Sequence, residues 1–178
     1  MLTLIITTFW FFLPAGIANM SPVLFKFLNF FNYPIDSNKT FLGRPMFGKN
    51  KTYRGFFFGI LMAILTVYIQ RLLYPFMINY SFVDYTQINI FLLGFLFGFG
   101  ALLGDLIESF FKRQLDIEPG KSFIPFDQID WILGAIILVN IYISLNLEIT
   151  IMSLVIFGLL HPMINLIGYA LKIKKNKF

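Results

Sequence analysis

The sequence predicts an all-α integral membrane protein with five transmembrane helices. Two observations predict this fold. The chain of 178 residues is 58% hydrophobic and only 13% charged, whereas soluble domains are about one quarter charged. Its apolar residues also form segments near 3–31, 55–74, 88–110, 129–147 and 149–171. Each is near the roughly 20 residues that a helix needs to cross a bilayer core.

The first apolar segment has the position of a secretory signal peptide but not its composition. Signal peptides begin with basic residues, and a short apolar core leads to a small-residue cleavage site. Here no basic residue precedes the apolar run, and the run continues past the small residues at 15–18. We therefore predict that residues 1–31 form a retained transmembrane helix.

The connecting segments predict the orientation in the membrane. Basic residues gather in loop 32–54, in segment 112–126 and in the C-terminal tail, whereas loop 75–87 contains no Lys or Arg. Cytoplasmic loops carry an excess of these residues. We expect a multi-pass protein of the cell membrane, with its N-terminus outside and with both basic loops and the C-terminus in the cytoplasm. The tail lysines also fit simple contact with anionic lipid headgroups.

The residue types present restrict the possible metal chemistry. The chain has no Cys and a single His, His161, which excludes disulfides, Cys-ligated zinc, iron–sulfur clusters and multi-histidine sites. A metal would be held mainly by oxygen, which favours magnesium, manganese or calcium. We predict no nucleic-acid partner.

Segment 104–131 concentrates charge in an otherwise apolar chain, with six acidic and three basic residues. Spacings of three and four place one polar set on a single face at the end of the third helix. This set is Asp105, Glu108, Ser109 and Lys112. Asp127 and Asp130 share a face in the same way where the fourth helix begins.

The link between these two helices is short and contains Pro119, Gly120 and Pro125. It can therefore fold back and bring the two acidic faces together. An ionised side chain at the centre of a membrane helix costs about 2.5–3.5 kcal/mol, so several of them need a compensating charge. A bound divalent cation would supply it. The alternative is internal pairing, for example of Asp105 with Lys112 or Arg113.

These residues carry a family resemblance. The pattern G-D-x-x-E-S-x-x-K-R at 104–113, followed by P-x-D-Q-x-D at 125–130, resembles the signature of cytidylyltransferases that activate lipid phosphates. Bacterial CDP-diacylglycerol synthases have a similar S-x-x-K-R and a closing D-R-x-D, in which Gln128 of this chain replaces the Arg. The closer resemblance is to the archaeal-type branch, the CDP-archaeol synthases, with D-Q-x-D.

Further motifs extend the resemblance over nearly the whole chain. They are L-P-A at 13–15, the loop G-K-N-K-T-x-R-G at 48–55, and H-x-x-x-N-x-x-x-Y at 161–169. The resemblance implies a single transmembrane cytidylyltransferase domain over residues 1–178, with cytoplasmic catalytic loops.

The resemblance also implies an activity in phospholipid biosynthesis. CMP would be transferred from CTP to an isoprenoid ether-lipid phosphate, giving CDP-archaeol and pyrophosphate. A CDP-diacylglycerol synthase acting on phosphatidic acid is an alternative. A small membrane transporter is another, although it predicts acidic residues spread through the depth of the membrane rather than crowded at one end.

The site residues follow from the same resemblance. Mg²⁺ would be held by Asp105, Asp127 and Asp130, with Lys112 and Arg113 as further catalytic residues. The predicted binding residues for nucleotide or lipid phosphate are Lys49, Lys51, Thr52, Arg54, Lys121, Glu108, Ser109, His161 and Asn165. Loop 48–55 would present backbone N–H groups to an anion at a helix start; alternatively it only sets topology. His161 and Asn165 equally fit helix packing.

Overall fold

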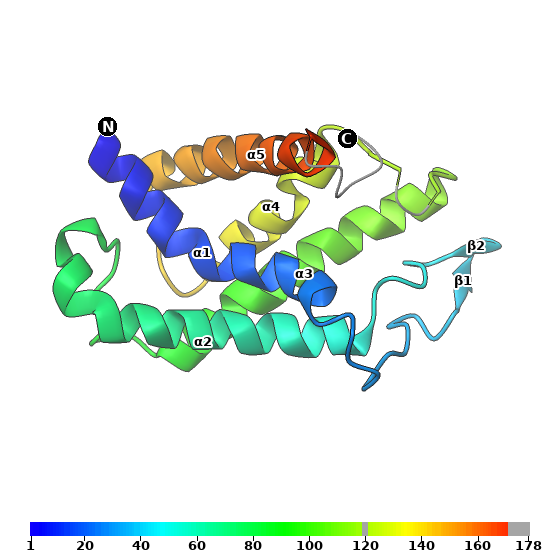
Figure 1. The fold of residues 1–178 in the computed structure, drawn as a ribbon, viewed down its shortest axis with the longest axis horizontal. Coiled ribbons are helices and arrows are strands. Elements are labelled where there is room, and N and C mark those ends of the chain that lie inside the picture. Colours follow the sequence, from blue (N-terminus) through cyan, green and yellow to red (C-terminus); the bar gives the residue numbers. More distant parts are fainter. Residues whose placement is uncertain (119–120, 171–178) are drawn as a thin grey trace.

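The computed structural model describes residues 1–118 and 121–170, without the side chains of 161–162 and 164–170. Within these residues the chain forms five α-helices, a 3₁₀ turn η1 (Ile78–Tyr80) and a small hairpin (Figure 1). The helices are α1 (Leu2–Leu24), α2 (Tyr53–Met77), α3 (Ile90–Gln114), α4 (Phe126–Asn140) and α5 (Leu147–Ala170). The hairpin pairs β1 (Thr40–Phe41) with β2 (Arg44–Pro45). The predicted all-helical class is confirmed.

The helices differ in how far they can reach across a membrane. Three of the described segments are long and apolar enough to cross it: α1, the continuous stretch Tyr53–Tyr80, and α3. Helix α5 has 24 residues. Helix α4 has 15 residues and, at 1.5 Å per residue, is about 22 Å long. It is therefore shorter than a hydrocarbon core of about 30 Å.

Two predicted span boundaries are wrong. Segment 129–147 ends as a helix at Asn140, because the Asn140 side chain accepts a hydrogen bond from Leu145 N (2.9 Å) and turns the chain toward α5. Segment 3–31 ends as a helix at Leu24. The residues that follow are held by Arg54, whose guanidinium donates to Leu28 O and whose backbone N–H donates to Phe31 O (2.9 Å).

An aromatic cluster joins α1 to the rest of the bundle. Phe11 and Phe12 of α1 both pack edge-on against Phe97 of α3, with ring centroids 5.1 and 5.6 Å apart. Phe12 also meets Phe157 of α5 at 6.4 Å. Edge-to-face pairs add about 0.5–1.5 kcal/mol to the free energy gained by burying the rings. This cluster fixes α1 against α3 and α5.

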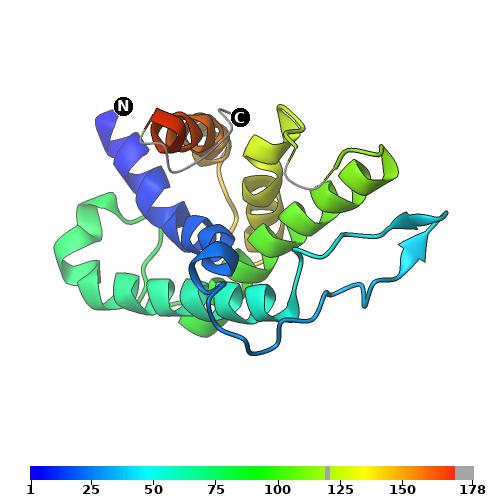
Figure 2. The same ribbon diagram turned by 45° about the vertical axis from the view of Figure 1, so that its right-hand side comes forward.

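Helices α3 and α4 touch through their backbones. A Cβ atom built on Gly104 of α3 would lie 2.2 Å from Asp130 O, and one built on Gly134 of α4 would lie 2.2 Å from Gly100 O. Small residues allow this close approach of membrane helices. The contact places the acidic end of α3 directly against the start of α4 (Figure 2).

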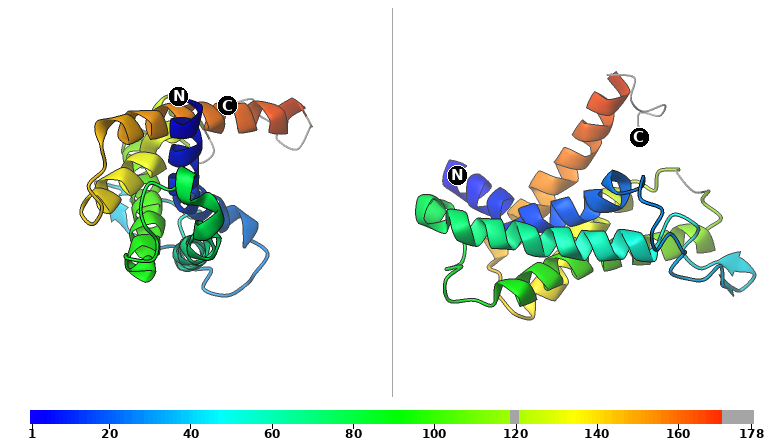
Figure 3. Two further views of the ribbon diagram at one scale, coloured as in Figure 1. Left: turned by 90° about the vertical axis from the view of Figure 1, so that its left-hand side faces the viewer. Right: turned by 60° about the horizontal axis from the view of Figure 1, so that its bottom comes forward.

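The remaining parts of the chain lie at the edges of this bundle. The hairpin β1–β2 projects beyond the C-terminal end of α3 (Figure 2). The C-terminal half of α5 extends away from the other helices, as Figure 3 shows in both views. Its residues Leu159 and Met163 are exposed, as expected for a surface that faces lipid hydrocarbon.

The glycine contact predicts a specific sensitivity to added volume. Gly104→Ala forces a methyl group into the backbone of α4, and overpacking of this kind costs about 1–3 kcal/mol. We expect a lower melting temperature in detergent.

Gly16→Ala is the matched control. Its new Cβ would meet nothing nearer than 3.9 Å, and alanine favours a helix over glycine by roughly 0.5–1 kcal/mol. Equal melting temperatures of the two variants would contradict the backbone contact between α3 and α4.

Candidate functional site

Three carboxylates meet where α3 crosses α4. Asp105 and Glu108 come from α3 and Asp130 from the first turns of α4, and one oxygen from each lies within 4.8 Å of the others. We call these three residues the acidic cluster. Two features bring these carboxylates together. The spacing of three residues puts Asp105 and Glu108 on one face of α3, and the glycine contact brings α4 against it. Glu108 is only 7% exposed.

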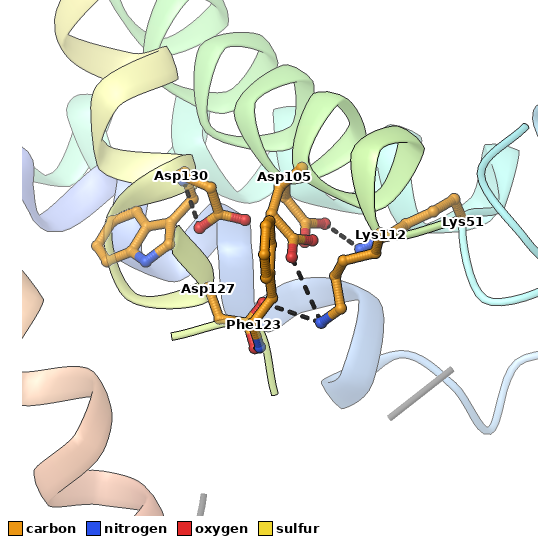
Figure 4. A network of polar contacts seen from close by, with 8 residues as sticks. Lys51, Asp105, Lys112, Phe123, Asp127 and Asp130 are labelled. Atoms are coloured by element: carbon orange, nitrogen blue, oxygen red, sulfur yellow. Dashed lines mark hydrogen bonds and ion pairs between the residues drawn. The ribbon is translucent and has the colours of Figure 1, made fainter. Parts of the chain in front are cut away.

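Two lysines neutralise part of this charge (Figure 4). Lys51, from the loop before α2, places its Nζ 2.5 Å from Asp105 Oδ2. Lys112 lies one helical turn after Glu108, with its Nζ 3.4 Å from Glu108 Oε1 and 2.9 Å from Asp127 Oδ1. Lys51 thus pairs with Asp105, and Lys112 lies between Glu108 and Asp127.

The predicted ligands Asp105, Asp127 and Asp130 are not the three carboxylates that cluster. Asp127 lies beside the cluster, and both of its oxygens are engaged: Oδ1 by Lys112 and Oδ2 by the Phe123 N–H at 2.8 Å. Glu108 takes its place in the cluster. A metal-ligand role for Asp127 stays a prediction.

The internal pairing considered for Asp105 takes a different form from the one expected. Lys112 and Arg113, the two candidates from α3, do not pair with Asp105 in the described structure, whereas Lys51 does. The spacing within α3 could not indicate this partner, because Lys51 lies on a loop far away in the sequence.

The acidic cluster fits a divalent cation. Glu108 Oε1 is buried and has no hydrogen-bond partner in the described structure, and a buried acceptor without a partner is costly. The donors are all carboxylate oxygens, which suit magnesium, manganese or calcium. The cluster therefore offers carboxylate ligands, and one of their oxygens still lacks a hydrogen-bond partner among the described residues.

The loop that carries Lys51 is built around the buried carboxylate of Asp36. Its Oδ2 accepts the N–H groups of Phe47 (3.0 Å) and Gly48 (3.1 Å), and its Oδ1 accepts the N–H of Asn38 (2.9 Å). A carboxylate that receives three backbone donors holds a loop strongly, since such charge-assisted bonds are stronger than neutral ones. Asp36 thus shapes the start of the basic motif at 48–55.

Two predicted binding residues of this motif have structural contacts. Thr52 caps α2 by accepting the Gly55 N–H at 3.2 Å, as N-cap threonines commonly do. Arg54 is buried and donates to Leu28 O. Both residues build the loop, and their contact with nucleotide stays a prediction.

A polar cavity of about 660 Å³ lies between this loop and the C-terminal end of α3. Lys49 lines it from the loop and Arg113 from α3, and the lining also includes the carboxylates Asp36, Asp116 and Glu118. Arg113 is 9% exposed, and its Nε has no hydrogen-bond partner among the described residues. A buried guanidinium with unused donors is suited to an anion.

An apolar cavity of about 450 Å³ lies between α3 and α4. Most of its wall is hydrocarbon, including Ile107, Phe111 and Leu133, while Glu108 and Asp130 of the acidic cluster line it at one side. Two residues of the acidic cluster therefore lie beside an apolar compartment.

The other predicted binding residues are more scattered. Ser109 is buried within α3. Lys121 is exposed and pairs with Glu118 at 2.9 Å, and this hydrogen bond holds the pKa of Glu118 below its ordinary value. His161 and Asn165 belong to α5, but their side chains lie outside the described residues.

The long apolar helices place the chain in the class of membrane proteins. A solved structure reported as an intramembrane enzyme for archaeal membrane lipid biosynthesis is similar, with a TM-score of 0.69 and 26% sequence identity. The match covers 89% of this chain and 92% of that one. The likeness extends over nearly all of both chains.

The family follows from the sequence comparisons. The family model described as CarS-like CDP-archaeol synthase matches residues 1–178. The CDP-archaeol synthase of Methanocaldococcus jannaschii is 36% identical over 173 residues, and that of Pyrococcus furiosus is 35% identical over 171 residues. Each match covers 96% of both chains. This chain belongs to the CDP-archaeol synthase family, which confirms the resemblance.

The loop anchored by Asp36 generates a prediction about local stability. Asp36→Asn sets an amide NH₂ against a backbone N–H in either orientation, because both carboxylate oxygens accept such donors. We expect trypsin to cut the loop after Lys39 and Lys49 about tenfold faster or more, since an unsatisfied buried donor costs about 1–3 kcal/mol.

Asp116→Asn is the control for this experiment. Asp116 pairs with Arg44 at 2.5 Å, but both side chains are exposed, and exposed pairs contribute little. Cleavage that rises equally in both variants would contradict the anchoring role of Asp36.

Proposed function

We propose that this chain transfers CMP from CTP to an isoprenoid ether-lipid phosphate, giving CDP-archaeol and pyrophosphate. The observation that carries the proposal is the position of the acidic cluster, which lines an apolar cavity on one side and contacts a basic loop on the other. A reaction between a lipid and a charged nucleotide needs an apolar surface for the lipid and basic groups for the nucleotide at the same site.

Asp105, Glu108 and Asp130 would hold a Mg²⁺ ion. When bound, such an ion neutralises charge on the triphosphate during the reaction. Asp127 would keep Lys112 in place beside it, through the ion pair of 2.9 Å. The fit of the ion is supported by the buried Oε1 of Glu108, which accepts no hydrogen bond from the part of the chain that the structure describes.

The chemical step needs little proton transfer. An oxygen of the lipid phosphate attacks the α-phosphorus of CTP, the new P–O bond forms, and the bond from that phosphorus to the bridging oxygen breaks. The electron pair leaves with pyrophosphate. A phosphate monoester is largely ionised near pH 7, since its second pKa is about 6. The enzyme's work is therefore positioning and charge stabilisation.

Basic side chains on two sides would hold the triphosphate. Lys112 faces the acidic cluster, and Arg113 faces the polar cavity together with Lys49. Lys112 and Arg113 are neighbours on α3, but successive helical residues point about 100° apart. One therefore faces the acidic cluster and the other faces the polar cavity. The triphosphate would run from the acidic cluster toward the polar cavity.

The apolar cavity would receive the lipid. Its lining from α3 and α4 is hydrocarbon next to Glu108 and Asp130, so a lipid entering there brings its phosphate to the acidic cluster. The CDP-archaeol synthase relatives support an isoprenoid ether lipid over phosphatidic acid.

The site would face the cytoplasm, where CTP is available, and the N-terminus would lie outside. The basic loop and the C-terminal end of α3 lie side by side at one end of the bundle (Figure 1), joined by Arg44 and Asp116. Positive charge gathered at one end is typical of the cytoplasmic side.

Pyrophosphate release in detergent tests the activity. We expect turnover that requires CTP, Mg²⁺ and the isoprenoid ether-lipid phosphate together, and that stops when EDTA removes the metal. Folded protein that binds CTP but turns over neither ether nor ester lipid would contradict the proposal. Faster turnover of phosphatidic acid would contradict the lipid assignment alone.

Manganese binding tests the proposed ligands separately from turnover. We expect Asp130→Asn to weaken Mn²⁺ binding by about tenfold or more, as loss of a charged ligand removes about 1.5–3 kcal/mol. Asp127→Asn should weaken it less, because Asp127 faces Lys112. The reverse order would return Asp127 to the ligand set. Electron paramagnetic resonance of free Mn²⁺ gives both affinities.

A further inference from the structure

The ion pair between Lys51 and Asp105 links the basic loop directly to the acidic cluster. We propose that Lys51 is an internal counterion that a divalent metal displaces, so that metal binding releases the Lys51 ammonium group toward the nucleotide. The proposal rests on the metal site of the proposed function. It adds an order of events, because the Lys51 ammonium group becomes available to the nucleotide only after the metal has bound.

The geometry makes the lysine and a metal competitors. Lys51 Nζ lies 2.5 Å from Asp105 Oδ2, and Asp105 offers an oxygen to the same cluster as Glu108 and Asp130. A divalent ion bound by three carboxylates is stabilised more strongly by Coulomb attraction than a single ammonium group bound by one carboxylate. The metal therefore has the advantage in this competition.

Glu108 provides an independent sign that the cluster is incomplete when Lys51 is the cation. Its Oε1 is buried and accepts no hydrogen bond from the described residues, and its ion pair with Lys112 Nζ is long, at 3.4 Å. Lys51 thus compensates Asp105, whereas Glu108 has only a longer ion pair with Lys112. A cation placed among all three would satisfy both.

The backbone around Lys51 is fixed, so the side chain can be released without moving the loop. Lys51 O accepts the Ile35 N–H at 2.8 Å, and Lys51 N donates to Gly48 O at 3.3 Å. The next residue, Thr52, caps α2. Only the flexible four-carbon stem of Lys51 has to rotate. The released ammonium group stays beside the site.

Lys112 is not expected to respond in the same way. Its shorter ion pair is with Asp127, at 2.9 Å, and Asp127 lies outside the acidic cluster. Lys112 can therefore keep a partner after the metal binds. This contrast makes Lys51 the mobile cation of the pair and Lys112 the fixed one.

The first test measures binding of Mn²⁺ alone to the full chain. We expect Lys51→Met to bind Mn²⁺ about tenfold more tightly than the unmodified protein, because the charge-assisted contact that competes with the metal is gone. Lys39→Met removes one positive charge from an exposed position in the same loop. It should leave the Mn²⁺ affinity nearly unchanged.

The second test follows Lys51 itself. Acetylation by a soluble active ester, read out by mass spectrometry, should proceed several-fold faster at Lys51 when Mn²⁺ is saturating, while Lys39 should react equally with and without the metal. A permanent structural ion pair would not give this change.

The outcomes separate this inference from the proposed function. Mn²⁺ binding that is unchanged or weaker in Lys51→Met, or labelling of Lys51 that ignores bound metal, overturns the displacement and leaves the metal site intact. Failure of Mn²⁺ to bind any of these proteins overturns the displacement and the proposed metal site together.

Discussion

The site depends on the backbone contact between α3 and α4. Gly104 and Gly134 remove the side chains that would hold the two helices apart. Because the helices touch there, Asp130 at the start of α4 comes within 4.8 Å of Asp105 and Glu108 on α3. The same crossing forms the apolar cavity. The proposed metal site and the proposed lipid site thus depend on one packing interaction.

The charge gathered by this contact determines the rest of the architecture. Carboxylates in membrane helices need partners, and the chain supplies Lys112 from α3 itself and Lys51 from a loop that Asp36 anchors. The loop is therefore part of the site rather than a connector. Its fixed backbone and flexible lysine stem allow the counterion to change without a change of fold.

The sequence predicted the helices and the two acidic faces well, because period and spacing are local properties. It could not predict which carboxylates converge: Asp127 and Asp130 share a face, but their positions relative to α3 depend on how the helices cross. The pairing of Lys51 with Asp105 was equally hidden, since only the folded loop brings them together. The early end of α1 depends on Arg54, a contact across the fold.

Anomalous scattering from crystals grown with Mn²⁺ and a non-reacting CTP analogue tests the account most directly. We expect a manganese peak among Asp105, Glu108 and Asp130, with Lys51 turned away from Asp105 toward the triphosphate. A manganese peak held by Asp127 or within the polar cavity, with Lys51 still paired to Asp105, would contradict it.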